Sequence, residues 1–238
     1  RMARAGMLEE VGSLWRSTLR IASIDGDLFL HSAYPTVGAD AVFFGPDTYR
    51  FARFMKQSLA RRLASVRPGK LMRVLDIGCG SGAGGVVVAR ALAAAGIKSA
   101  VTMNDINPAA LTLTAANAEI AGVAVTLAAG DALSAVEGDF DLIVCNPPYL
   151  DDEGQRSYRH GGAHLGRALG VRIAAEALQR LAPGESEQVA GQAGAVLSRP
   201  QRHGAQLRDV QRRDVERFDD EGDVRHHRRE GIVDLVRN

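Results

Sequence analysis

The fold is decided by one stretch of the chain, Val74-Leu75-Asp76-Ile77-Gly78-Cys79-Gly80-Ser81-Gly82. Its first half is an apolar run typical of a strand, and its second half is a turn rich in glycine. Glycine has no Cβ, so it permits tight turns and lets a ligand approach the backbone closely. The spacing Gly80-x-Gly82-x-x-Gly85 also satisfies the fingerprint of dinucleotide sites. The stretch therefore predicts a nucleotide-like ligand without identifying it.

Strands and helices alternate outward from this turn. We predict strands over 72–77, 101–104, 123–127 and 140–145, and helices over 48–66, 86–95, 107–121 and 167–182. The run Leu142-Ile143-Val144 is typical of a strand buried on both faces. Alternation of this kind indicates an α/β, Rossmann-like, doubly wound and mostly parallel sheet.

The chain divides into three parts by pattern. Residues 1–40 are predicted to be an N-terminal helix plus hairpin extension, because 7–20 has roughly helical apolar spacing and Asp25-Gly26 separates two alternating runs. Residues 41–184 form the ligand-binding domain. Residues 185–238 are predicted to be an aberrant or disordered tail.

The tail differs from the rest in composition. Residues 185–238 contain 10 Arg, 11 acidic residues and no Lys. One interpretation is a solvated helical extension or a disordered segment. The other is a shifted reading frame, because such text is typical of GC-rich DNA translated out of frame. In either case we expect the C-terminal strands of the sheet to be missing or aberrant.

Bulk properties exclude some classes of protein. The net charge is +1, which gives no global attraction to nucleic acid or membrane, although a local basic patch would suffice for a nucleic-acid substrate. No apolar run approaches 18 residues, so we expect no membrane span and no membrane partner. The two cysteines, Cys79 and Cys145, form no metal-type pair, and a reducing cytoplasm is the simplest location. His160 and His164 are separated by glycines, which favours a loop, so we expect no metal.

Two acidic residues follow the second and third predicted strands. Asp105, in Asn104-Asp105-Ile106, can accept from both hydroxyls of a ribose. Asp131, in Gly130-Asp131-Ala132, can accept from an adenine amino group. Together with the glycine turn and the motif described next, these acids complete the set of residues expected to contact a bound ligand: Asp76, Gly78, Cys79, Gly80, Gly82, Asp105, Ile106, Asp131, Ala132 and Asn146.

The fourth motif is Asn146-Pro147-Pro148-Tyr149, at the carboxyl end of the fourth strand. Ligands bind at that edge of an open parallel sheet. The Asn146 side-chain oxygen and the Pro147 carbonyl can accept both hydrogens of one NH2 group. Tyr149 can stack on a flat target. The motif predicts Asn146, Pro147 and Tyr149 as catalytic residues and Asn146 to Tyr149 as the substrate site.

These four motifs, in this order, resemble class I S-adenosylmethionine-dependent methyltransferases. The subgroup with Asn-Pro-Pro-Tyr includes protein-(glutamine-N5) methyltransferases acting on release factors and adenine-N6 and guanine-N2 methyltransferases. The resemblance is closest to the glutamine group and its "small domain" relatives, over about residues 40–184. Phe44-Gly45-Pro46-Asp47-Thr48 looks like the element that packs over the cofactor in that family, and Tyr158 to Gly166 looks like its Gly-Gly loop.

The resemblance implies S-adenosyl-L-methionine as cofactor and methylation of a planar NH2 nitrogen, with a protein glutamine side chain, for example of a translation factor, as the first expectation. The alternative is a base of RNA or DNA. A release-factor enzyme of this family carries a long helical N-terminal domain, and fewer than 50 residues precede Phe44. An NAD-dependent dehydrogenase and an inactive cofactor-binding module remain as rival hypotheses.

Overall fold

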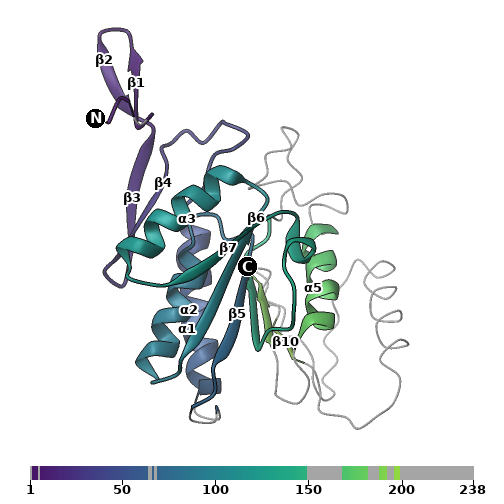
Figure 1. Cartoon of the computed structure of the whole chain (residues 1–238). Helices are drawn as coiled ribbons and strands as arrows, with labels where there is room; N and C mark the ends of the chain where they lie inside the picture. Colours follow the sequence, from purple (N-terminus) through teal and green to yellow (C-terminus); the bar gives the residue numbers. More distant parts are fainter. Residues whose placement is uncertain are drawn as a thin grey trace.

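A six-stranded sheet forms the centre of the molecule in this computed structural model (Figure 1). The structure describes residues 2–4, 6–63, 66, 69–148, 168–181, 188–191 and 196–198. The helices are α1 (Pro46–Leu63), α2 (Ala83–Ala94), α3 (Pro108–Ile120), α5 (Ala168–Arg180) and the 3-10 helix η1 (Ala132–Ala135). The strands are β1 (Leu8–Val11), β2 (Leu14–Ser17), β3 (Leu19–Ile24), β4 (Asp27–Ser32), β5 (Met72–Ile77), β6 (Ser99–Asp105), β7 (Val125–Ala129), β8 (Leu142–Cys145), β9 (Gln188–Gly191) and β10 (Val196–Ser198).

The strand order is β10-β9-β8-β5-β6-β7. Every neighbouring pair is parallel except β10 and β9. Counted from β5, the order is that of a doubly wound sheet, whose ligands bind at the carboxyl ends where the order reverses. That point lies between β5 and β8, where Ile77 is in register with Cys145. The predicted fold class is therefore confirmed.

The central strands are buried on both faces, as the apolar runs predict. Val74 of β5 packs in one cluster with residues of α1 and α2, such as Met55 and Val88. Leu75 packs in the other cluster with residues of α5, such as Ile173. This alternation follows from the two-residue period of a strand. It places α1 and α2 on one side of the sheet and α5 on the other (Figure 1).

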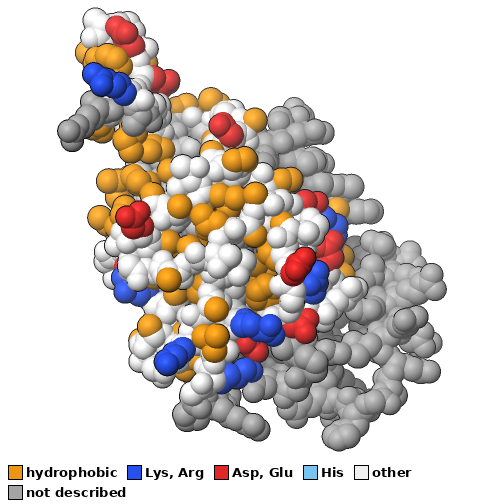
Figure 2. Space-filling view, in the orientation of Figure 1, with side chains coloured by type: hydrophobic (Ala, Val, Ile, Leu, Met, Phe, Trp, Pro, Cys, Tyr) orange, Lys and Arg blue, Asp and Glu red, His pale blue; other side chains and the backbone are white. Residues whose placement is uncertain are grey.

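The N-terminal region corrects one prediction. Residues 7–20 form no helix: β1 and β2 pair as an antiparallel hairpin around Gly12, whose φ is +63°. The hairpin projects from the body (Figure 1), and its side chains are largely exposed, Leu14 at 72% and Trp15 at 59% (Figure 2). The helical spacing of the apolar residues in 7–20 is coincidental. A helix would need a surface that buries its apolar face, and in the described structure these side chains stay exposed. A positive φ at Gly12 instead favours a tight turn.

The second hairpin, β3–β4, matches its prediction. Its turn is Asp25-Gly26, and both residues have positive φ. Phe29 is fully buried in the core, and Asp27 forms a two-bonded ion pair with Arg90 of α2, at 2.7 and 3.0 Å. The hairpin is thus packed onto the domain rather than appended to it.

The C-terminal part corrects a second prediction. The sheet continues after Gly184, since β9 pairs in parallel with β8 and β10 pairs with β9. The physical reason is that β8 would otherwise leave its backbone groups without partners along one buried edge. Residues 199–238, which carry most of the unusual composition, lie outside the described residues. Among the described residues, no helix combines the length and apolar character needed to cross a membrane.

Candidate functional site

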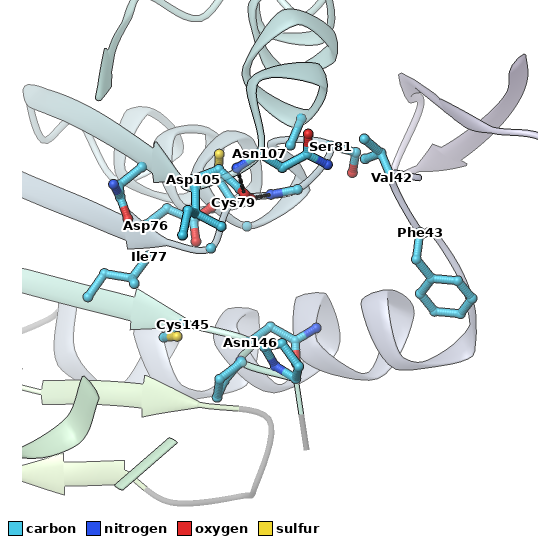
Figure 3. Close-up of a pocket in the computed structure, with 18 of the residues that line it drawn as sticks. Val42, Phe43, Asp76, Ile77, Cys79, Ser81, Asp105, Asn107, Cys145 and Asn146 are labelled. Carbon is cyan, nitrogen blue, oxygen red and sulfur yellow. Dashed lines mark hydrogen bonds between the residues drawn. The ribbon is translucent and has the colours of Figure 1, made fainter. Parts of the chain in front are cut away.

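A cleft opens at the carboxyl ends of β5, β6 and β8 and contains about 1050 Å³ of free space, open solvent included. Figure 3 shows Asn146 and Cys145 across this space from Asp105 and Cys79, with Phe43 at one side. Of the predicted cofactor and substrate residues, the cleft is lined by Asp76, Gly78, Cys79, Gly80, Asp105, Ile106, Asp131, Ala132, Asn146, Pro147 and Pro148. Residues up to 72 positions apart in the sequence therefore line one cleft, and their roles in binding stay a prediction.

The glycine turn forms one wall of the cleft. Gly78 and Gly80 have φ of +65° and +56°, and a Cβ added at either would meet nothing within 4 Å. The space beside them is therefore available to a ligand. Gly82 has a different role: it precedes α2 with φ +78°, and a Cβ there would lie 2.9 Å from Thr114 Cγ2. Gly82 does not line the cleft and serves helix packing.

Asp76 stabilises the glycine turn by a hydrogen bond with the first turn of α2. Its carboxylate accepts a hydrogen bond of 2.7 Å from the backbone N–H of Gly85. A Cβ on Gly84 would lie 2.6 Å from Asp76 Oδ2, so this close approach requires glycine. Burial raises the pKa of Asp76 to about 7; the Gly85 hydrogen bond opposes that rise and the Asp105 charge adds to it. Asp76 therefore contacts the loop that forms the site as well as the cleft.

Asp105 lies at the end of β6 and is positioned by two backbone donors. Gly80 N–H donates to Oδ2 at 2.8 Å, and Asn107 N–H donates to Oδ1 at 2.9 Å. Burial raises its pKa, and the backbone hydrogen bonds counteract this. Ile106 N–H is a further backbone donor to this carboxylate, so at least one of its four acceptor positions stays free. Asp105 can therefore still accept from a ligand hydroxyl, and its contact with a ribose stays a prediction.

The turn after β7 brings Asp131 and Ala132 to the cleft. The buried Asn104 holds it, because Asn104 Nδ2 donates to the carbonyls of Ala128 and Gly130 at 3.1 and 3.0 Å. Asp131 forms an ion pair with Arg172 of α5, whose hydrogen bonds lower the pKa of that carboxyl. Ala132 has φ +47°, in the left-handed region that side chains disfavour.

Asn146 follows β8 and carries the most unusual atom of the site. Its Oδ1 is buried and has no hydrogen-bond partner, which is true of no other side-chain nitrogen or oxygen among the described residues. Pro147 and Pro148 line the cleft beside it. Tyr149 lies outside the described residues, as do Tyr158 to Gly166 with His160 and His164.

A segment before α1 supplies residues that sequence patterns did not single out. Ala41, Val42 and Phe43 line the cleft, and Asn107 Nδ2 donates to the Asp40 carbonyl at 2.8 Å. Phe44, in the predicted cofactor-covering element, is buried and stacks on His31 at 5.2 Å. The stretch 44–48, which looks like the family's cofactor-covering element, was the sequence signal for this region. It did not predict that Phe44 contacts the β3–β4 hairpin.

The charged side chains in the described lining of the cleft are acidic, and one of them, Asp131, is paired with Arg172. The described lining includes Asp76, Asp105 and Asp131 but no Lys or Arg. Cys79 and Cys145 are buried, and burial raises the pKa of both thiols well above the ordinary value. Both side chains also line the cleft, so a packing role for them stays a prediction. In the described part of the chain, no group of three His, Cys, Asp or Glu could hold a metal ion.

Comparison with known proteins follows this geometry. A family model described as the methyltransferase small domain matches residues 55–189, more than half of the chain. The chain belongs to this family. The match spans the glycine turn, the acidic strand ends and the Asn-Pro-Pro motif. This removes the dehydrogenase hypothesis that the glycine spacing had left open.

Two relatives of known name illustrate the similarity. The release factor glutamine methyltransferase of Deinococcus radiodurans is 42% identical over 88 residues, covering 37% of this chain and 30% of that protein. The ribosomal RNA small subunit methyltransferase C of Klebsiella pneumoniae is 33% identical over 121 residues, covering 48% of this chain and 34% of that protein. The chain thus spans about a third of the length of these relatives.

Solved structures include a T. thermophilus 16S rRNA N2 G1207 methyltransferase in complex with AdoMet and guanosine. It has a TM-score of 0.48 and 24% sequence identity, and the match covers 76% of this chain and 43% of that one.

Proposed function

We propose that this small-domain methyltransferase is an S-adenosylmethionine-dependent N-methyltransferase that modifies a planar NH2 nitrogen. The observation that carries the proposal is the partnerless, buried Oδ1 of Asn146 at the cleft. An unsatisfied buried acceptor costs about 1–3 kcal/mol. An NH2 group of a substrate would satisfy it with one hydrogen and the Pro147 carbonyl with the other.

The residues present fit the proposed cofactor. Gly78 and Gly80 leave space beside the backbone, and Asp105 retains acceptor capacity for a ribose hydroxyl. When bound, S-adenosylmethionine supplies an electrophilic methyl group on a positively charged sulfur. Asp105 is held by backbone donors rather than by a cationic side chain, so its negative charge suits such a cation better than a pyrophosphate.

Asn146 would act by orienting the nucleophile. The lone pair of an amide or aniline-like nitrogen is delocalised, so the nitrogen is a poor nucleophile. Holding both of its hydrogens directs the lone pair toward the methyl donor and favours pyramidalisation. Catalysis would come mainly from alignment of the two reactants, and the proton can leave after attack without a dedicated base.

We further propose a protein glutamine side chain as the target. A nucleic-acid substrate would bring several phosphates toward the site, and their neutralisation normally needs Lys or Arg. The described lining of the cleft offers none. A nucleobase is the second candidate, because the similarity to the ribosomal RNA methyltransferase covers more of this chain than the similarity to the glutamine enzyme. The buried free thiols suit a reducing cytoplasm, which we propose as the compartment.

A transfer assay with methyl-labelled cofactor tests the proposal. Cell extract is separated into protein and RNA fractions after incubation with the purified chain. We expect label in protein, at glutamine. Label in RNA bases would replace glutamine by the second candidate. Absence of label from both fractions, together with no binding of S-adenosylhomocysteine by calorimetry, would contradict the proposed function.

A further inference from the structure

We infer that Arg172 is a positioning residue for the base end of the cofactor: it holds the Asp131 carboxylate at the cleft wall, ready to accept from an exocyclic amino group. The inference rests on the proposed cofactor. Arg172 lies on α5, 24 residues after Pro148, and belongs to none of the four sequence motifs.

The contact between Arg172 and Asp131 is bidentate, with one hydrogen bond to each carboxylate oxygen. Arg172 Nη1 donates to Asp131 Oδ2 at 2.9 Å, and Nη2 donates to Oδ1 at 2.6 Å. Two parallel bonds from a planar guanidinium fix the plane of a carboxylate as well as its position. Each oxygen keeps one lone pair for a further donor. Asp131 lines the cleft, so a ligand can reach that lone pair.

No hydrogen bond within its own turn explains the position of the Asp131 carboxylate. Asp131 stands at the N-cap of η1, yet its side chain makes no capping hydrogen bond. The turn around it is strained, because Ala132 has φ +47° and a left-handed conformation costs a non-glycine residue about 1–2 kcal/mol. Asn104 holds the turn from the inside through Gly130, and Arg172 holds it from the outside.

The ion pair is poorly suited to a purely stabilising role. The side chains of Arg172 and Asp131 are 42% and 52% exposed. Exposed ion pairs contribute about 0–1 kcal/mol. The helix that carries Arg172 is itself fixed beside the site: Ile173 is buried at the cleft, and a Cβ on Gly170 would lie 3.6 Å from Pro147 Cγ. Arg172 therefore extends from a helix that packs beside the cleft to the carboxylate of Asp131. The other two carboxylates of the described lining, those of Asp76 and Asp105, accept hydrogen bonds from backbone N–H groups.

Calorimetry with two ligands tests the inference. S-adenosylhomocysteine carries the amino group, and S-inosylhomocysteine has a carbonyl oxygen in its place. We expect Arg172→Met to weaken S-adenosylhomocysteine binding about tenfold, the effect of one charge-assisted hydrogen bond, and to change binding of the inosyl ligand less than about twofold. Arg172→Lys should fall between, because lysine keeps the charge without the planar fork.

Arg180→Met is the matched control. It removes another arginine of α5, whose Nη1 donates to the Gly138 carbonyl at 3.2 Å, away from the cleft. It should leave the affinity for both ligands unchanged. Equal weakening of both ligands by Arg172→Met, or no weakening of either, would overturn the positioning role. If the wild-type chain binds neither ligand, the proposed cofactor is wrong and the inference fails with it.

Discussion

Replacing Asn146 by alanine should separate stability from turnover. The substitution removes a buried oxygen that has no partner, and such an atom costs about 1–3 kcal/mol. The side chain borders an open cleft, so its removal leaves no sealed cavity. We expect Asn146→Ala to gain about 1 kcal/mol in free energy of unfolding. In a chain of this size, that corresponds to an increase in Tm of about 2–4 °C.

Turnover should move in the opposite direction. Without Asn146 the target nitrogen loses one of its two acceptors and its alignment with the methyl donor. A loss of about 100-fold or more in kcat is expected, since alignment accounts for a large part of the barrier in such reactions. Affinity for S-adenosylhomocysteine should fall far less. The readouts are thermal unfolding, calorimetry and methyl transfer on one preparation.

Asn104→Ala provides the matched comparison. Asn104 is fully buried, whereas Asn146 is partly buried with its Oδ1 out of solvent, and the Asn104 amide donates to the carbonyls of Ala128 and Gly130. Its removal should therefore lower the free energy of unfolding, by about 1–3 kcal/mol. If Asn146→Ala destabilises the protein as much as Asn104→Ala does, the Asn146 oxygen is not an unsatisfied acceptor. If its turnover and cofactor affinity fall equally, its assigned role is wrong.

Three further predictions concern the support of the site. Asn117→Ala should lower the free energy of unfolding by about 2–4 kcal/mol and expose the Leu30 amide to hydrogen exchange. The reason is that the buried Asn117 side chain forms hydrogen bonds with the backbone N–H and carbonyl of Leu30 and with the Ser81 carbonyl. An unchanged exchange rate at Leu30 would refute this. Gly80→Ala should weaken S-adenosylhomocysteine binding more than tenfold while costing only about 1 kcal/mol of stability, because its Cβ meets no protein atom and competes only with a ligand; calorimetry and melting decide between the two effects. Asp76 has a raised pKa of about 7 in the folded protein, so its contribution to stability is fully present below its unfolded pKa near 4 and is lost as pH rises through 7. Asp76→Asn should therefore flatten the fall in Tm between pH 5 and pH 8. An unchanged fall would count against the buried Asp76 carboxyl as its source.

The central sheet could be predicted because each of its signals is local. Apolar runs of four to six residues gave the strands, and Asn107-Pro108 gave the start of α3, where the Asn107 side chain accepts from Ala109 N–H at 2.9 Å. The carboxyl ends of parallel strands meet at one edge by geometry. Asp76, Asp105 and Asn146 could therefore be assigned to one site without knowledge of any distance.

Predictions failed where the outcome depends on partners far away in sequence. The apolar residues of 7–20 carry no signal that their face stays exposed, so their spacing predicted a helix where a hairpin forms. The pairing of β9 depends on the free edge of β8 rather than on its own composition. Arg172 could not be connected to Asp131, since 41 residues separate them and an arginine on a helix is usually solvated.

The asparagines show what the structure adds to the motif. Asn104, Asn107, Asn117 and Asn146 all reach the interior or the cleft, and the sequence offers no basis for ranking them beyond the prolines after Asn146. The amides of the first three are used by the fold itself, on β7, on the segment before α1 and on the β3–β4 hairpin. Only the Asn146 oxygen is left without a partner in the described part of the chain. Because evolution and folding both disfavour an unsatisfied buried acceptor, the atom that the fold leaves unpaired is the one that a substrate NH2 group is best placed to satisfy.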